Sequence, residues 1–351
     1  MFQRTSPSDA SGATPHRLLE LDALRGIAAL IVVLFHYTTH YDRVYGHSAP
    51  LCVQVPFGKY GVQLFFAISG FVILMSLERI ERARDFLLGR VARLYPAYWA
   101  GLVLTFTVVT VFGLPQREVS AAAALVNLSM FQEFFRVPHV DGVYWTLTVE
   151  LSFYALVLVL LSARMLGKVI SLFIVLVALQ TLAELGLQAM GWADAARFAG
   201  RPHLQFFALG VLAFKWSRGE VPLRAALALT GVCLAHELLV GSTTTVIVFG
   251  VVLGVAYALS TGAMRWLAWR PLTFLGFISY PLYLLHQNIG YLIILRLEAT
   301  GWRPEAAVVA ALAAALLLAT VVTHLVEQPA LRFYRRWRKR SHARASVPAT
   351  E

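Results

Sequence analysis

Three ionisable residues lie in the first apolar segment of the sequence, which reads LDALRGIAALIVVLFHY. They are Asp22, Arg25 and His36. Titratable groups at bilayer depth are costly and by default mark function. Arg25 and His36 are 11 positions apart, close to three turns of an α-helix, so they share one helix face with a rise of about 16 Å between them. We therefore expect a guanidinium at one end of this face and a candidate general base at the other.

A carboxylate in a later apolar segment matches the expected depth of His36. Glu150 lies in YWTLTVELSFY, and counting the helical rise from Val143 places it about 10 Å below the outer surface. At that depth it could orient the imidazole of His36 as a general base. The alternative is that each residue is structural and forms hydrogen bonds elsewhere, and the residues alone leave both interpretations open.

Two arginines, Arg90 and Arg93, are one helical turn apart in ERIERARDFLLGRVARLYPAYW. We expect them at the mouth of the third helix, where two guanidiniums can bind phosphate groups as bidentate donors. The alternative is that they only anchor the helix on the cytoplasmic side, as most arginines beside membrane spans do.

Further polar residues occur in and between the apolar segments. ISYPLYLLHQ contains Pro281, which is expected to interrupt the helical hydrogen bonds. Ser69 and Gly70 in FFAISGF are expected to form a close-packing point between helices. Other polar side chains either line a cavity or join helices by hydrogen bonds. The candidates for a cavity lining are Asp22, Trp145, Tyr280, Tyr283, His286 and Glu327.

These residues are embedded in a strongly apolar chain. Of its 351 residues, 58% are hydrophobic and 14% charged, and the mean hydropathy is +0.67, whereas about a quarter of a soluble domain is charged. Apolar stretches of about 20 residues fit transmembrane helices better than the roughly ten-residue strands of a membrane barrel. The sequence predicts an all-α membrane helix bundle. Its ten predicted spans are 19–40, 57–77, 94–113, 143–163, 168–190, 203–216, 223–241, 243–260, 272–296 and 305–327.

The distribution of basic residues predicts the side on which each loop lies. If the N-terminus is cytoplasmic and segment 120–135 does not cross, most of the 30 Lys and Arg residues fall on the cytoplasmic side, as the positive-inside rule requires. Segment 120–135 is therefore expected to be a re-entrant or interfacial helix on the outer side, and both termini to be cytoplasmic. The first 18 residues lack the apolar core of a signal peptide, so the first helix is expected to be retained.

One membrane domain is expected over 19–329, between a polar cytoplasmic segment, 1–18, and a basic tail, 330–351. The net charge of +11 comes from helix ends and this tail, a pattern that favours membrane lipid with anionic headgroups as a partner and argues against nucleic acid. Two cysteines, Cys52 and Cys233, are too few for a disulfide framework. We expect no metal and no permanently bound cofactor.

Several of these segments, taken in order, resemble the acyltransferase 3 family of integral-membrane acyltransferases, which includes O-antigen acetylases. The similarity runs from about Leu19 to Pro329. It consists of a basic residue, ten positions and a histidine in the first segment, then FFAISGFVI, RVARLYPAYW, YWTLTVELSFY, ISYPLYLLH and VEQP. The resemblance implies transfer of an acyl group, usually acetyl, from cytoplasmic acyl-CoA to a hydroxyl of a carbohydrate or glycolipid, in the bacterial cytoplasmic (inner) membrane.

The resemblance also implies roles for single residues. His36 matches the proposed catalytic histidine of the family, and Glu150 matches the acidic residue of its fourth-helix motif. Arg90 and Arg93 match the pair thought to contact the acyl donor. Some members carry a fused extracytoplasmic hydrolase-like domain that finishes the transfer. This chain has none, so we expect its membrane domain to pass the acyl group directly to the acceptor.

The resulting hypothesis places the phosphates of acyl-CoA on Arg25, Arg90 and Arg93, with the pantetheine arm reaching towards His36. That histidine either acts as a general base, oriented by Glu150, or is itself acylated as a relay.

Two rival hypotheses exist. A proton-coupled secondary transporter could use the buried His and Glu as relay groups, but the sequence shows no inverted repeat. A glycan flippase or polymerase is expected to carry a long extracytoplasmic loop, and the longest loop predicted here is short.

Overall fold

The computed structural model describes residues 18–78, 80, 82–200 and 203–345, and these residues form helices and turns without any β-strand. The helices are α1 Leu19–Phe35, α2 Tyr41–Val44, α3 Gly61–Leu77, α4 Ala83–Phe112, α5 Ala121–Asn127, α6 Trp145–Ser162, α7 Val169–Ala189, α8 Ala193–Gly200, α9 Leu204–Ser217, α10 Leu223–Leu239, α11 Thr243–Ser260, α12 Arg270–Leu285, α13 Gln287–Ala299, α14 Pro304–Val322 and α15 Gln328–Ala345. The all-α fold class is therefore confirmed.

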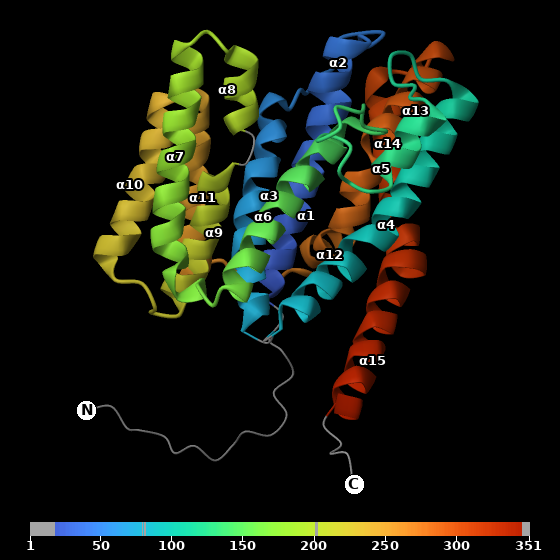
Figure 1. Ribbon diagram of the computed structural model, residues 1–351. Helices are drawn as coiled ribbons and strands as arrows, with labels where there is room; N and C mark the ends of the chain where they lie inside the picture. The colour runs from blue at the N-terminus through green and yellow to red at the C-terminus, as the bar shows by residue number, and fades with distance from the viewer. Residues whose placement is uncertain (1–17, 79, 81, 201–202, 346–351) are drawn as a thin grey trace.

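The helices form two groups joined through α3 and α6 (Figure 1). Helices α7 to α11 make one group, and α1, α4 and α12 to α14 make the other. We call the two ends of the bundle upper and lower as Figure 1 draws them. The short helices α2, α5 and α8 lie at the upper end, while α4 begins at the lower end and α15 extends below the bundle.

Six helices in the described part of the chain are long and apolar enough to cross a membrane. They are Pro56–Leu77, Ala83–Phe112, Gly142–Ser162, Leu166–Ala189, Thr243–Ser260 and Pro304–Ser341. Each of these helices overlaps one of the ten predicted spans, which supports the prediction of an integral membrane protein. The exact number of crossings and the side of each terminus stay predictions.

The third predicted span begins earlier than expected. Helix α4 begins at Ala83 and contains both Arg90 and Arg93, which the sequence placed at its mouth. The alternation of charged and apolar residues in its first turns lowers the mean hydropathy but keeps an apolar face, because Phe86 and Leu94 are buried. The two guanidiniums therefore project from a rigid helix.

The ninth predicted span is divided into α12 and α13 at His286. Pro281 lies inside α12 and is buried. It removes one backbone N–H from the helical hydrogen bonds, but the helix continues past it and ends only at Leu285. The division leaves backbone carbonyls at the end of α12 open to side-chain partners, and His286 uses two of them, those of Leu282 and Tyr283.

Segment 120–135 does not cross the bundle. It contains only α5, whose seven residues rise about 10 Å, and a series of turns. Three aromatic residues of α4 hold it in place, since Tyr95, Tyr98 and Trp99 each donate a hydrogen bond to one of its carbonyls. The prediction that this segment is not a span agrees with its length.

Close contacts between glycines and the backbone of a neighbouring helix position the central helices of the bundle. A Cβ atom on Gly276 of α12 would lie 1.8 Å from the carbonyl oxygen of Asp22 in α1, and one on Gly70 of α3 would lie 2.3 Å from that of Phe207 in α9. Real atoms cannot approach so closely, so both positions require glycine. The predicted close-packing point at Ser69 and Gly70 is confirmed for Gly70.

Gly276→Ala should therefore destabilise the protein, although alanine usually stabilises a helix interior by about 1 kcal/mol relative to glycine. We expect a loss of about 1–3 kcal/mol from overpacking against α1, measured as a lower midpoint of thermal unfolding in detergent. Gly250→Ala in α11 is the matched control, because nothing lies within 4 Å of its added methyl group. Equal midpoints for the two variants would contradict the α1–α12 contact.

Candidate active site

His36 lies where α1 changes into a π-helical segment, His36–His40. Single π-helical turns occur often at functional sites. The Nδ1 atom of His36 lies 2.9 Å from the carbonyl oxygen of Val32 and 3.1 Å from Nε2 of His286. The second imidazole is completely buried and belongs to the junction of α12 and α13.

The carbonyl partners determine where the imidazole protons lie. Nδ1 of His286 lies 2.8 Å from the carbonyl oxygen of Tyr283, and a carbonyl only accepts, so this Nδ1 carries the proton and Nε2 has the lone pair. His36 must likewise donate from Nδ1 to Val32, and the same N–H can be shared with His286 Nε2. The Nε2 atom of His36 is then the basic nitrogen.

The predicted contact between Glu150 and His36 is not formed. In the described part of the chain, the carboxylate of Glu150 accepts hydrogen bonds from Ser69 Oγ, at 3.1 Å, and from Tyr154 Oη. His286 occupies the position beside His36 instead. Counting helical rise gives the level of a side chain but not the neighbour that it faces, which is why the two residues were paired from sequence.

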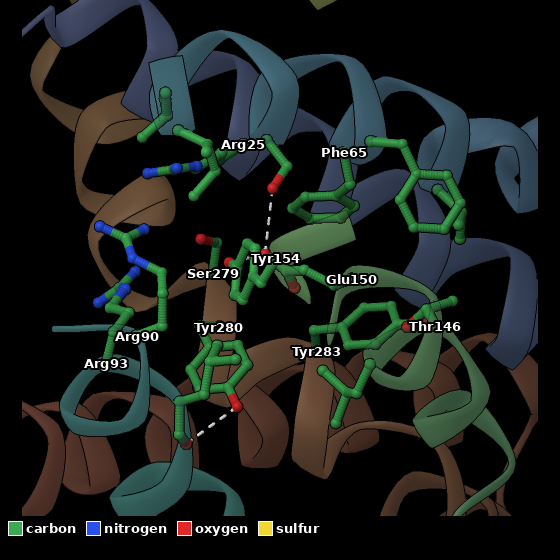
Figure 2. A pocket seen from close by; sticks show the side chains of 17 residues that line it. Arg25, Phe65, Arg90, Arg93, Thr146, Glu150, Tyr154, Ser279, Tyr280 and Tyr283 are labelled. Atoms are coloured by element: carbon green, nitrogen blue, oxygen red, sulfur yellow. Dashed lines mark hydrogen bonds between the residues drawn. The ribbon is translucent and has the colours of Figure 1, made fainter. Parts of the chain in front are cut away.

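Glu150 lines a cavity in the lower half of the bundle, with an empty volume of about 820 Å³. Figure 2 shows Arg25, Arg90 and Arg93 grouped at one side of this lower cavity, and Phe65 with Tyr283 at the other. The structure therefore brings together the three arginines that the sequence selected. The cavity changes from basic to aromatic along its length.

Acidic and aromatic neighbours hold the three guanidiniums in place. Arg93 forms an ion pair with the buried carboxylate of Glu327, and Asp22 lies 3.8 Å from Arg25. The Arg90 guanidinium lies over the ring of Tyr154 at 5.7 Å. Asp22 and Glu327 were expected among the cavity-lining residues, but they lie outside the set that lines it and act through the arginines.

His36 lines a second cavity, above the first, with an empty volume of about 780 Å³. We call it the upper cavity. Val62 and Tyr283 line both cavities, so the two adjoin at these side chains. Of the remaining predicted residues, Trp145 lines the upper cavity and Tyr280 the lower one. His286 lines neither of them, and contacts His36 from behind.

Several residues of the upper cavity escaped the sequence analysis. They are His40, Lys59, Arg117 and Gln287. His40 follows His36 by one helical turn, which is a signal that sequence could have used, and its Nδ1 lies 2.6 Å from Tyr291 Oη. Lys59 lies in the short helical turn Pro56–Tyr60 before α3, and Arg117 lies in a loop. A lone basic residue at either place carries no distinctive sequence pattern.

The loop before α6 is fixed by a buried carboxylate. Asp141, which precedes the span Gly142–Ser162, accepts hydrogen bonds from the backbone N–H groups of Val143, at 3.2 Å, and Asn288, at 3.1 Å. Burial raises the pKa of Asp141 to about 7. These bonds attach the loop to α13 beside the upper cavity.

An all-α membrane bundle with a basic cavity adjoining a cavity that contains an unprotonated imidazole nitrogen has the parts of a group-transfer enzyme. The chain belongs to the acyltransferase 3 family, because the family model, described as an acyltransferase domain, matches residues 18–324. It is therefore a membrane acyltransferase.

Three curated rhizobial proteins are similar to parts of this chain or to most of it. The exopolysaccharide production protein ExoZ of Rhizobium meliloti (strain 1021) is 27% identical over 78% of this chain and 90% of its own length. Protein 2 in the picA locus of Rhizobium radiobacter is 36% identical over 30% of this chain and 54% of its own. Nodulation protein 10 of Rhizobium leguminosarum bv. viciae is 29% identical over 28% of this chain and 32% of its own. No solved structure matches the chain.

His286→Ala should lower the acyl-transfer rate because His36 loses the acceptor for its shared N–H. We expect a fall of roughly tenfold, equivalent to about 1.4 kcal/mol of transition-state stabilisation, which is near the upper value for one hydrogen bond. The measurement is the transfer rate from radiolabelled acetyl-CoA in purified membranes.

The control for this prediction is the double variant. If His286 acts only through His36, His36→Ala with His286→Ala should be no slower than His36→Ala alone. A further loss in the double variant would show that His286 has an independent role and would remove the positioning interpretation.

Proposed function

We propose that this protein is an O-acyltransferase that moves an acyl group, acetyl in the first instance, from cytoplasmic acyl-CoA to a hydroxyl of a cell-surface or lipid-linked glycan. It would act in the bacterial cytoplasmic membrane, with the lower end of the bundle facing the cytoplasm. The exopolysaccharide named for the ExoZ relative supports a polysaccharide acceptor, and the basic residues of α15 at the lower end support the orientation.

The observation that carries this proposal is the basic nitrogen of His36. Its Nδ1 proton is used by Val32 and His286, so Nε2 is left as a proton acceptor in a cavity that adjoins the arginine-lined one. A general base needs such a lone pair within reach of the hydroxyl from which it takes the proton. The two adjoining cavities would supply the donor from below and the acceptor from above.

The lower cavity suits a donor with phosphates at one end and a thioester at the other. Three guanidiniums line the entrance, while the carboxylates of Asp22 and Glu327 lie outside the lining. The cavity side of the entrance therefore presents mainly N–H donors, which favours the phosphates of CoA. The other end, at Phe65 and Tyr283, is aromatic and would contact the uncharged pantetheine arm. Glu150 lies between these ends and would accept hydrogen bonds from the amide N–H groups of the arm.

In the proposed reaction, Nε2 of His36 takes the proton of the acceptor hydroxyl while its oxygen attacks the thioester carbonyl carbon. The carbon–sulfur bond then breaks, and the CoA thiolate receives the proton from the imidazolium of His36. His286 stabilises that imidazolium by accepting its Nδ1 proton in a hydrogen bond. In the relay form of the reaction, Nε2 attacks the thioester first, and an acyl-histidine accumulates when acceptor is absent.

His36→Ala should lower acyl transfer by about 10²–10⁴-fold, the usual contribution of a general base, while the protein still inserts in membranes. The measurement is acetyl transfer to surface glycan, followed by mass spectrometry of glycans from cells with and without the protein. His324→Ala is the control, because His324 is exposed and lines neither cavity. Normal activity in His36→Ala would refute the proposal.

Arg90→Gln should raise the KM for acetyl-CoA by about tenfold, since one charged hydrogen bond contributes roughly 1.5 kcal/mol or more. Arg90 is a cleaner test than Arg93, because Arg93→Gln would leave the buried carboxylate of Glu327 without its ion pair. Arg224→Gln, which removes an exposed charge from the start of α10, is the control. An unchanged KM in Arg90→Gln would exclude Arg90 from the donor site.

A further inference from the structure

A third polar cavity lies among α3, α7, α9, α10 and α11, and the proposed reaction does not use it. Its empty volume is about 500 Å³, and no residue that lines the lower or the upper cavity lines it. Its polar lining includes the side chains of Gln63, Glu184, His203, Gln205, His236 and Glu237. We call it the acidic cavity.

The two carboxylates of the acidic cavity are almost fully buried. Glu184 is 5% exposed and Glu237 is 4% exposed. Gln205 Nε2 donates to Glu237 at 2.8 Å, and Gln180 Nε2 donates to Glu184 at 3.0 Å. Among the described residues that line the cavity there is no Lys or Arg. The polar neighbours of these two groups are therefore amides, imidazoles and hydroxyls such as that of Thr245. A pair of buried carboxylates in such surroundings keeps spare capacity to accept hydrogen bonds.

An amide oxygen without a hydrogen-bond partner distinguishes this cavity from ordinary polar contacts between helices. Gln205 is 3% exposed, and its Oε1 has no hydrogen-bond partner. The Oε1 atom of Gln63, on α3, has none either. Polar groups that only join helices are normally paired. Here acceptor oxygens in excess face an open space, which requires a ligand that brings hydrogen-bond donors.

The acidic cavity and the upper cavity are adjacent, because residues within one short stretch, 59–63, line one or the other. Lys59 and Val62 line the upper cavity, while Tyr60 and Gln63 line the acidic one. The His203 ring bridges the same region, with its centroid 5.8 Å from that of Trp145, which lines the upper cavity. A chain-like ligand with one unit at His36 could therefore place its next unit in the acidic cavity.

We propose that the acidic cavity binds the sugar unit next to the one that is acylated, and that this unit is neutral and rich in hydroxyl groups. The inference rests on the proposed glycan acceptor. Sugar hydroxyls would donate to Glu184, Glu237 and the free amide oxygens, and the rings of Tyr60 and Phe206 would cover the apolar face of the sugar. A uronic acid is selected against, because its carboxylate would meet two others and the described lining residues include no lysine or arginine.

The test measures binding of defined saccharides to the full-length protein in lipid nanodiscs by isothermal titration calorimetry. The probes are cellotetraose, which is neutral, and tetragalacturonic acid, which is anionic. Wild type should bind cellotetraose more tightly than tetragalacturonic acid. Glu237→Gln and Gln63→Leu should each weaken cellotetraose binding by about tenfold. Glu305→Gln is the control, because it removes a partly exposed carboxylate that does not line the cavity, and it should bind as wild type does.

Equal cellotetraose affinity in wild type, Glu237→Gln and Gln63→Leu would overturn the subsite, as would equal affinity for the two probes or no binding by wild type. If Glu237→Gln fails to fold, Gln63→Leu decides, since the Gln63 oxygen has no partner to lose. If acetyl transfer depends on His36 but saccharide binding is unchanged in Glu237→Gln, the subsite proposal is refuted and the proposed acyltransferase function stands. If saccharide binding depends on Glu237 but acetyl transfer does not depend on His36, the subsite stands and the proposed reaction is refuted.

Discussion

The hydrogen bond from His36 Nδ1 is the interaction on which the proposed chemistry depends. It fixes the tautomer, because Val32 and His286 both need a proton on that atom. His286 can accept it only because its own Nδ1 is bound to the carbonyls of Leu282 and Tyr283. Those carbonyls end α12, which Gly276 brings against α1 at Asp22. A contact between helix backbones thus positions two imidazoles about three to four turns further up.

The arginines of the lower cavity are likewise held in place by residues that do not line it. Glu327, which holds Arg93, lies in the π-helical segment Thr323–Glu327 between α14 and α15, and the carboxylate of Asp22 lies on the same helix as Arg25. Both acids stand outside the cavity lining. The two acids thereby hold Arg25 and Arg93 in place from outside the cavity that these guanidiniums line.

The fold class, the approximate positions of most helices and many residues of the two cavities could be predicted from the sequence. Which of these residues contact each other was predicted less well. Hydropathy locates a helix that is apolar throughout, but it misses the first turns of α4, where charges alternate with buried residues such as Phe86. Helical spacing correctly put Arg25 and His36 along one helix. It could not show that His36 faces His286 rather than Glu150, because rotation about a helix axis depends on packing partners far away in sequence. The polar cluster around Glu184 and Glu237 was missed because its members are spread over four predicted spans, with only one or two on each.

The junction of the two cavities has an electrical consequence. Since Val62 and Tyr283 border both spaces, the insulating layer at this point is about one side chain thick, whereas hydrocarbon elsewhere in a bilayer is about 30 Å thick. If water fills both spaces, the membrane voltage falls across that thin layer. In the proposed reaction, an uncharged acyl group would cross this layer without electrical work, while the phosphates of the proposed donor would remain on the side from which they entered.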